Sequence, residues 1–368
     1  MSLCATPFHA RTAAANQANA WLTRNGFTIC HSYSDPLSEA LAARVRVGMA
    51  DVSARWRVML EGPHVVELLQ RLITRNPVQL MPGQALKALW LNDAGGLRGC
   101  GTFARHSRES FMLHSASRDA RWIASAAALF GVGMREVSAD TGGLAVFGPR
   151  ASAVLESAGL KLELAQLAFR RQSWRGVDIV LSRLGDHSGY EIWCAPDDAL
   201  VVWDRVAAAG QAFGMAPIGA ASLDILDLEA GIPRAGRDFL PAEDAAAIEP
   251  APRTLGLDGV VDPKHVLFNG RTGWLKSVDT RRLVGIEIDS ETAAPHVQLR
   301  QDRRAVGRTL SSVYSPALRR AIALAQVEEE AGRPGTALSL TLPTSLTAPM
   351  PREASAQVAA LPFLGSLS

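Results

Sequence analysis

One acidic residue stands within an otherwise apolar, strand-like segment, the glutamate of "GDHSGYEIW". Alternation along a strand places Tyr190 and Ile192 on one face and Glu191 and Trp193 on the other. A carboxylate on a buried face needs hydrogen-bond or ion-pair partners, because desolvating it alone is costly. Glu191 is therefore a candidate ligand-binding residue, and the alternative is a strand glutamate that faces solvent.

The glycine-rich segment "GGLRGCGTFAR", residues 95–105, predicts the turn of a hairpin between the runs "ALKALWLND" and "SFMLHSA". The absence of side chains at Gly99 and Gly101 predicts open volume, which we expect to admit a bulky substrate. Cys100 between them is a candidate nucleophile, with Arg98 and Arg105 nearby in the sequence. The alternative for Cys100 is a small, partly buried residue that only fills space.

Composition argues against several classes of function. The net charge of +2 gives no strong attraction to nucleic acid or to an anionic membrane surface. The four cysteines form no CxxC motif and no Cys/His cluster, so neither a metal site nor a disulfide framework is expected. The N-terminus lacks an apolar signal core, and no apolar run is long enough for a membrane span. We therefore expect a cytoplasmic protein.

The pattern of elements indicates a mixed fold. A strand followed by Gly-Pro and a helix occurs twice, in "RVMLEGPHVVELL" and "LAVFGPRASAVL", which suggests two related α/β units. The segment "DPLSEALAARV" predicts a helix with Ser38 as its N-terminal cap. From Arg281 onward, short β-type runs separated by turn residues predict a small all-β domain.

Several stretches in a fixed order resemble the folate-dependent aminomethyltransferases. This family includes the T-protein of the glycine cleavage system, the dimethylsulfoniopropionate demethylases and the folate domains of dimethylglycine and sarcosine dehydrogenases. The stretches are "GMADVS", "LITRNPVQLMPGQALKALWLNDAGGL", "FGPRA", "SGYEIWCAPDDALVVWDRV", "DLEAGIPRAGRDF", "VLFNGRTGWL", "VGRTLSSVYSP" and the closing "LPF". Together they span nearly the whole chain.

The resemblance implies an α+β fold of three domains, arranged like a cloverleaf around a central folate-binding opening. We expect a discontinuous first α/β domain over residues 1–51 and 141–262. A second α/β domain is expected as an insertion over residues 52–140. A linker and a C-terminal β-barrel would occupy residues 263–368.

The resemblance also implies residue roles. Glu191 matches the family glutamate that holds the pterin ring of tetrahydrofolate, a flat heterocycle whose N–H groups can donate two hydrogen bonds to a carboxylate. Tyr190, Trp193 and His187 complete the expected cofactor-binding set. A core role for Trp193 is the alternative. His187, or Asp186 beside it, either replaces a family tyrosine in a shortened turn or faces water.

Two departures from the family pattern concern the substrate side. Gly99 and Cys100 stand where the T-protein carries a pair of aspartates, so the acid that stabilises positive charge during transfer is missing. Leu223 and Asp227 stand where the family helix carries arginines. Asp224 and Asp227 share a helix face, which either holds a cationic substrate or part of the pterin, or is solvated. Asn92 is expected to approach the substrate.

Two functions follow from the resemblance. The first is a tetrahydrofolate-dependent methyltransferase or demethylase for a small N-, S- or O-methylated compound, with an upstream oxidoreductase or folate-recycling enzymes as partners. A donor that already carries positive charge needs less help from an acid, so the missing aspartate argues more against glycine cleavage than against demethylation. The second is a folate-binding accessory protein without transferase activity. The accessory branch carries a "KGCYxGQE" motif, whereas this chain has "KHVLFNGRTG".

Overall fold

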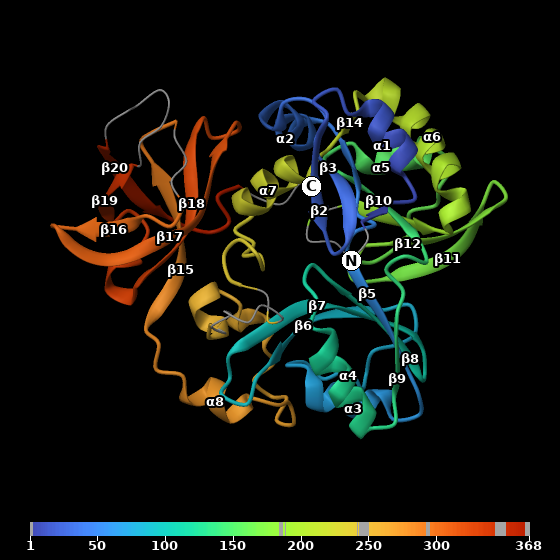
Figure 1. The fold of residues 1–368 in the computed structure, drawn as a ribbon, viewed down its shortest axis with the longest axis horizontal. Helices are drawn as coiled ribbons and strands as arrows, with labels where there is room; N and C mark the ends of the chain where they lie inside the picture. The colour runs from blue at the N-terminus through green and yellow to red at the C-terminus, as the bar shows by residue number, and fades with distance from the viewer. Residues whose placement is uncertain are drawn as a thin grey trace. The chain divides into compact units, whose positions relative to one another are not determined.

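The computed structural model describes residues 3–183, 187, 189–240, 242, 250–291, 295–342 and 351–364. The chain divides into two compact units. The main parts of the first are Met1–Ala88 and Cys100–Leu223, and the second comprises Leu89–Gly99 and Asp224–Gly365. The architecture is a mixture of helices and several sheets that ends in a closed β-barrel (Figure 1), which confirms the expected fold class.

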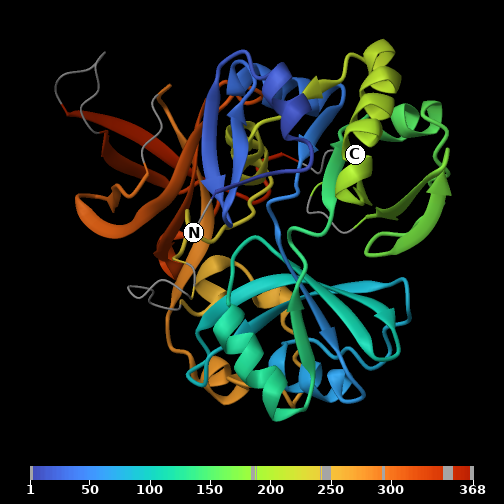
Figure 2. The same cartoon turned by 45° about the vertical axis from the view of Figure 1, so that its right-hand side comes forward.

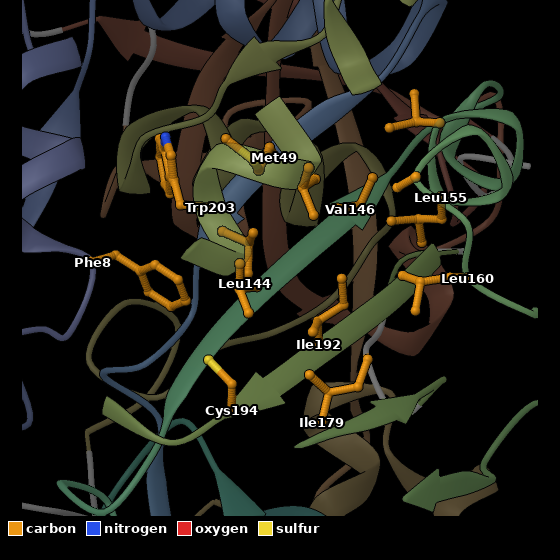
Figure 3. Close-up of a cluster of buried hydrophobic side chains, with 14 of the residues drawn as sticks. Phe8, Met49, Leu144, Val146, Leu155, Leu160, Ile179, Ile192, Cys194 and Trp203 are labelled. Atoms are coloured by element: carbon orange, nitrogen blue, oxygen red, sulfur yellow. The ribbon is translucent and has the colours of Figure 1, made fainter. Parts of the chain in front are cut away.

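A six-stranded sheet with strand order β11-β12-β13-β10-β4-β14 forms the centre of the first unit. Its strands are β4 (Gly48–Asp51), β10 (Gly142–Phe147), β11 (Phe169–Trp174), β12 (Val177–Ser182), β13 (Gly189–Cys194) and β14 (Ala216–Pro217). Helices α1 (His9–Ala15), α5 (Ala151–Ser157) and α6 (Ala199–Gly210) lie beside it. Figure 3 shows the apolar core between one face of this sheet and the helices, with Leu144, Ile192, Leu155 and Trp203 among its members.

A smaller sheet of order β1-β3-β2 carries the N-terminal residues, with strands β1 (Cys4–Ala5), β2 (Ala20–Arg24) and β3 (Phe27–Ser32). Helix α2 (Pro36–Val45) follows it. The N-terminal cap of α2 is Asp35, whose carboxylate accepts from the backbone N–H groups of Leu37 and Ser38. The expectation of Ser38 as the cap is therefore wrong, because Pro36 already occupies the first helical turn and the cap must precede it.

A five-stranded sheet of order β6-β7-β8-β5-β9 is built by the central part of the chain. Its strands are β5 (Trp56–Glu61), β6 (Ala85–Leu91), β7 (Leu97–Ser107), β8 (Ser110–Ser115) and β9 (Gly133–Glu136). Helices α3 (Val65–Leu72) and α4 (Ala120–Leu129) cover one of its faces (Figure 2). Helix α3 begins shortly after Gly62-Pro63, and α5 begins shortly after Gly148-Pro149, as the repeated Gly-Pro pattern predicted.

The motif "GMADVS" joins the two larger sheets of the first unit. The two carboxylate oxygens of Asp51 accept from the backbone N–H of Ser53, at 3.0 Å, and from the hydroxyl of Thr6, at 2.6 Å. The hydroxyl of Ser53 accepts from the backbone N–H of Gly143, and the N–H of Val52 donates to the carbonyl of Gly143. This end of β4 is thereby fixed to β10, and the chain leaves it at a defined point to enter β5.

The second unit contains the barrel. Its closed strand order is β15-β18-β17-β16-β19-β20. The strands are β15 (Arg281–Ile288), β16 (Gln298–Gln301), β17 (Arg304–Ser315), β18 (Arg320–Glu328), β19 (Ala337–Leu342) and β20 (Arg352–Ala359). Alternate residues of these strands, such as Val284, Ile286 and Ile288, fill the barrel interior. The β-rich C-terminal domain expected from Arg281 onward is thus present.

Helix α7 (Ala220–Glu229) leads into the second unit, and the short helix α8 (Arg271–Lys276) precedes the barrel. The three-domain bounds expected from the sequence stay a prediction. In the chain, β4 and β10 flank the segment that builds the five-stranded sheet.

Over the described ranges, no helix combines the length and apolar character needed to cross a membrane. The same residues contain no group of three or more histidine, cysteine or acidic side chains placed to hold a metal ion. The four cysteines are free thiols.

Candidate functional site

Glu191 lies in the interior of the first unit. Its exposed fraction is 3%, so the alternative of a solvent-facing strand glutamate is wrong. The guanidinium of Arg55 donates from Nη1 to Oε1 of Glu191, and Trp193 donates from Nε1 to Oε2 at 3.2 Å. The two carboxylate oxygens thus have different partners, which fixes the orientation of the carboxylate.

Trp193 lies beside Glu191, as the strand alternation predicted, and the backbone of the neighbouring strand makes room for it. Gly143 of β10 pairs with Trp193, and a Cβ added to Gly143 would lie 2.3 Å from Cζ3 of the indole. The indole therefore rests directly on a glycine backbone. The guanidinium of Arg57 stacks 4.2 Å from the centroid of the indole, and the His114 ring contacts it edge-on at 5.6 Å.

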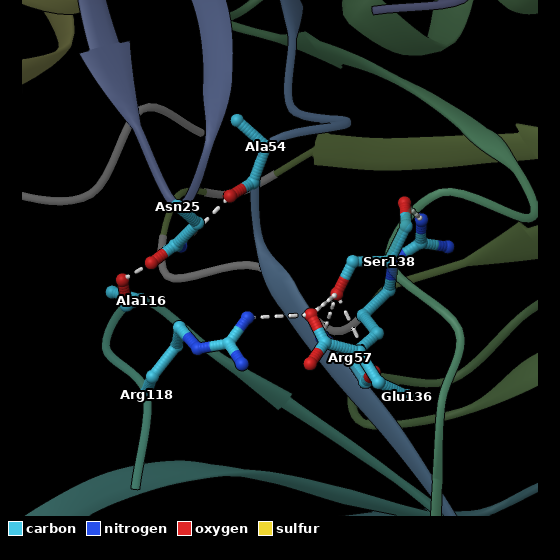
Figure 4. Close-up of polar contacts among 7 residues, drawn as sticks. All are labelled: Asn25, Ala54, Arg57, Ala116, Arg118, Glu136 and Ser138. Atoms are coloured by element: carbon cyan, nitrogen blue, oxygen red, sulfur yellow. Dashed lines mark hydrogen bonds and ion pairs between the residues drawn. The ribbon is translucent and has the colours of Figure 1, made fainter. Parts of the chain in front are cut away.

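Arg57 is a buried cation that is held by backbone and hydroxyl oxygens. It donates from Nη2 to the carbonyls of Ser138, at 2.7 Å, and Thr141, at 3.0 Å, and from Nη1 to the hydroxyl of Thr141. Figure 4 shows Ser138 between Arg57 and Glu136, whose carboxylate also pairs with Arg118. Burial, with the neighbouring charge of Arg55, lowers the pKa of Arg57 to about 10. Arg57 therefore stays charged at neutral pH.

His114 on β8 is a neutral imidazole in this cluster. Burial lowers the pKa of His114 well below its ordinary value, and the charges of Arg57 and Arg55 lower it further. Nδ1 of His114 and Nε of Arg57 are buried without a hydrogen-bond partner among the described residues. The cluster of Arg55, Arg57, His114, Glu191 and Trp193, which we call the glutamate cluster, therefore has unused hydrogen-bonding capacity at buried atoms.

Family models match most of the chain. The GCVT N-terminal domain matches residues 8–252, and the glycine cleavage T-protein C-terminal barrel domain matches residues 281–363. The chain belongs to the glycine cleavage T-protein family. Aminomethyltransferases of this family are enzymes that use tetrahydrofolate.

Individual T-protein relatives agree with the family models. The trimethylamine-oxide aldolase of Ruegeria pomeroyi is 31% identical over 91% of this chain, which spans only 44% of that protein. An aminomethyltransferase of Desulfitobacterium hafniense is 28% identical over 86% of this chain and 88% of its own length. The crystal structure of the glycine cleavage system aminomethyltransferase T from Bartonella henselae has a TM-score of 0.85 and 23% identity, covering 99% of this chain and 98% of that chain. This last likeness shows the shared fold.

The other residues expected to bind cofactor have different contacts in this T-protein family chain. Tyr190 packs against the apolar core on the opposite face of β13, together with Ile192. Its ring also lies under the Arg183 guanidinium, at 5.3 Å. His187 contacts the ring of Phe147 at 5.7 Å. Asp186 lies outside the described residues. Among the described residues of the expected cofactor set, a hydrogen bond joins Glu191 and Trp193. A cofactor-binding role for Tyr190 and His187 stays a prediction.

The glycines of the family hairpin leave no open volume. A Cβ on Gly99 would lie 2.2 Å from the indole of Trp90, and a Cβ on Gly101 would lie 2.6 Å from Leu113. The expectation of vacant space for a bulky substrate is therefore wrong, because neighbouring side chains already fill it. A substrate-binding role for Gly99 and Gly101 stays a prediction without that support.

Asn92 shapes the hairpin turn in the second unit. Its Oδ1 accepts from the backbone N–H of Gly96 at 2.8 Å, and its own N–H donates to the Gly96 carbonyl. The tip of this turn packs on the family segment "VLFNGRTGWL". A Cβ added to Gly95 in the turn, or to Gly273 in that segment, would collide with backbone atoms of the other. The structure thus gives Asn92 a turn-forming role, and its contact with substrate stays a prediction.

The acids of α7 are paired within the second unit. Asp224 forms an ion pair with Arg237 at 3.0 Å, and Asp227, which is fully buried, pairs with Arg234. The alternative of a solvated acidic face is therefore wrong for Asp227. Both arginines come from "GIPRAGRDF", so this family segment supplies the partners of the acids. A substrate that binds Asp224 would have to compete with Arg237 for its carboxylate.

Cys100 is half-buried, and its carbonyl accepts from the Ser115 hydroxyl at 2.9 Å. Arg105 does not serve as an activating cation, since its guanidinium donates to the carbonyls of Leu80, Ser107 and Arg108. We expect Cys100→Ala to keep one-carbon transfer within about threefold of wild type, as a space-filling residue would. Steady-state kinetics check this, and a loss of transfer with unchanged tetrahydrofolate affinity would instead support the nucleophile.

His114 predicts a pH dependence of stability. Because the pKa of His114 is lower in the folded state, the unfolded chain binds more protons between the folded value and about 6.5. The free energy of unfolding should therefore fall as the pH drops below about 6.5, and His114→Gln should make this slope shallower. Urea unfolding from pH 7.5 to 5 measures it, with the exposed His64→Gln as control. Equal slopes in wild type and His114→Gln would contradict the assignment.

Three members of the glutamate cluster, Arg55, Arg57 and His114, were not found by sequence reasoning. Arg57 carried a usable signal, since it is a charged residue at an inward position of the apolar strand "RWRVML". Arg55 carried none, because its partner Glu191 is 136 residues away in the sequence.

Proposed function

We propose that this T-protein family member transfers a methyl or other one-carbon unit from a small N-, S- or O-methylated compound to tetrahydrofolate. The observation that carries the proposal is the buried, oriented carboxylate of Glu191 on the strand face opposite the apolar core. The hydrogen bonds of the nearby buried cation Arg57 go to Ser138 and Thr141, and those of Glu191 come from Arg55 and Trp193.

The residues present suit a pterin. Each carboxylate oxygen has two lone-pair positions. Among the described residues, Arg55 and Trp193 use one on each, which leaves Glu191 two acceptor positions for a pair of N–H donors. Nε of Arg57 and Nδ1 of His114 add buried polar atoms without partners among the described residues. Tetrahydrofolate, when bound, supplies the nitrogen that accepts the one-carbon unit. The chain would hold its ring through Glu191 and Trp193.

The methylated donor is expected to carry its own positive charge. The hairpin places Gly99 and Cys100 where the family resemblance implies aspartates, so no carboxylate there stabilises a developing cation. A quaternary ammonium, sulfonium or amine oxide donor is already charged at the reacting atom. The relative named for trimethylamine-oxide fits this class. An upstream oxidoreductase or a folate-recycling enzyme is the expected protein partner.

The test is a coupled binding and product assay. The full chain is incubated with tetrahydrofolate and a panel of trimethylamine N-oxide, methylated amines, sulfonium acids and methoxyarenes, and folate products are quantified by mass spectrometry. Formation of methyl- or methylene-tetrahydrofolate from at least one donor supports the proposal. Binding of tetrahydrofolate without product from any donor would favour the accessory role. Absence of tetrahydrofolate binding would contradict both functions.

A further inference from the structure

In the ion pair between Arg55 and Glu191, Arg55 is the member that a ligand can reach from solvent. The side chain of Arg55 is 30% exposed, whereas that of Glu191 is 4% exposed. Arg55 lies in the bend between β4 and β5, where its N–H donates to the carbonyl of Val52, so the backbone of the fixed "DVS" turn positions it. A ligand that meets the exposed end of the pair therefore meets the guanidinium of Arg55 beside the carboxylate.

The pair presents an ordered hydrogen-bonding edge. Oε2 of Glu191 accepts from Trp193 and Oε1 accepts from Arg55, and each oxygen retains one acceptor position. The guanidinium next to Oε1 has five N–H donors, of which Glu191 takes one. From the Trp193 side to the Arg55 side, the hydrogen-bonding groups are Oε2, Oε1 and the Arg55 guanidinium, in the order acceptor, acceptor, donor. A ligand edge with the order donor, donor, acceptor complements it.

The pyrimidine edge of a pterin has this order, since its 2-amino group and N3–H are donors and its O4 carbonyl is an acceptor. We propose that Arg55 is a specificity residue that recognises the O4 carbonyl of a reduced pterin whose N3–H and 2-amino group bind Glu191. This inference rests on the proposed function. It makes the protein selective for 4-oxo over 4-amino pteridines, because a 4-amino group would set a donor against the guanidinium.

Glu191 would give part of this selectivity, because the neutral 4-amino ring has no N3–H and offers the carboxylate only its 2-amino group. The donor of Arg55 would give the other part, because it distinguishes a carbonyl from an amino group at position 4. Arg57 has only Nε left to offer, since both of its Nη atoms are engaged by Ser138 and Thr141. The guanidinium of Arg55, by contrast, donates directly to Oε1 of Glu191 and is partly exposed. The recognition of position 4 is therefore assigned to Arg55.

The experiment measures the affinities of tetrahydrofolate and its 4-amino-4-deoxy analogue by titration calorimetry. Wild type should prefer tetrahydrofolate by roughly 100-fold, because the analogue loses one hydrogen bond to Glu191 and one to Arg55, each worth about tenfold. Arg55→Met should reduce the preference to about tenfold, the part that Glu191 contributes, and Arg55→Lys should give a value between these two. Arg320→Met, which removes an exposed cation of the barrel from its pair with Glu287, should keep the full preference.

The outcomes separate this inference from the proposed function. Equal wild-type affinity for the two ligands, or a full preference in Arg55→Met, overturns the role of Arg55 and leaves tetrahydrofolate binding intact. Binding of neither ligand by wild type overturns the proposed function and this inference together. If Arg55→Met fails to fold, the preference for tetrahydrofolate is compared between wild type and Arg55→Lys. An undiminished preference in Arg55→Lys would then count against the role of Arg55.

Discussion

Replacing Glu191 with glutamine is expected to weaken tetrahydrofolate binding by roughly 10- to 100-fold, the largest effect we expect on binding. A hydrogen bond to a charged group contributes about 1.5–3 kcal/mol, and each 1.4 kcal/mol is tenfold in affinity. The glutamine amide would also place a donor where Arg55, Trp193 or the pterin already donates. Titration calorimetry with tetrahydrofolate measures the change.

The matched control for this variant is Glu287→Gln in the barrel strand β15. Glu287 forms an ion pair with Arg320, and its side chain is 30% exposed. This control removes one strand carboxylate outside the glutamate cluster, so tetrahydrofolate affinity should stay within about twofold of wild type. If Glu191→Gln lowers the free energy of unfolding but leaves the affinity unchanged, Glu191 serves the fold and the proposed pterin contact is wrong.

The fold was largely predictable because its main signals are local. Period-two alternation in "GYEIW" placed Ile192 in the core and Glu191 with Trp193 on the other face, as the structure shows. The same alternation placed Tyr190 with Ile192, so its assignment to the cofactor set went against the pattern of its own strand. A cofactor-binding role for Tyr190 therefore stays a prediction that rests on the family resemblance alone.

The parts that were missed depend on packing between distant segments. A glycine in the sequence indicates only that its own side chain is absent, and says nothing of the neighbour that fills the space. Trp90 fills it at Gly99, and Leu113 fills it at Gly101. The partner of Glu191 is likewise set by tertiary structure, since Arg55 reaches it from a bend before a strand of a different sheet. Neither arrangement leaves a periodic pattern.

Gly143→Ala is expected to disturb both the fold and the site, because the space above Gly143 is occupied by the indole of Trp193. The added Cβ would lie 2.3 Å from Cζ3 and 2.5 Å from Cη2, so the ring must move. Trp193 is 5% exposed and is stacked against Arg57, which leaves it little room. We expect the free energy of unfolding to fall by about 1–3 kcal/mol, as for other overpacked interiors. Urea unfolding monitored by circular dichroism measures this.

The same displacement should carry Nε1 of Trp193 away from Glu191 and weaken tetrahydrofolate binding by roughly tenfold, since a fixed carboxylate becomes a mobile one. Gly133→Ala in strand β9 is the matched control. Its added Cβ would meet only the Glu61 carbonyl, at 3.4 Å, so stability and affinity should stay near wild type. Unchanged affinity in a folded but destabilised Gly143→Ala would show that Trp193 supports the sheet without orienting Glu191. The glutamate would then depend on Arg55 alone for its orientation.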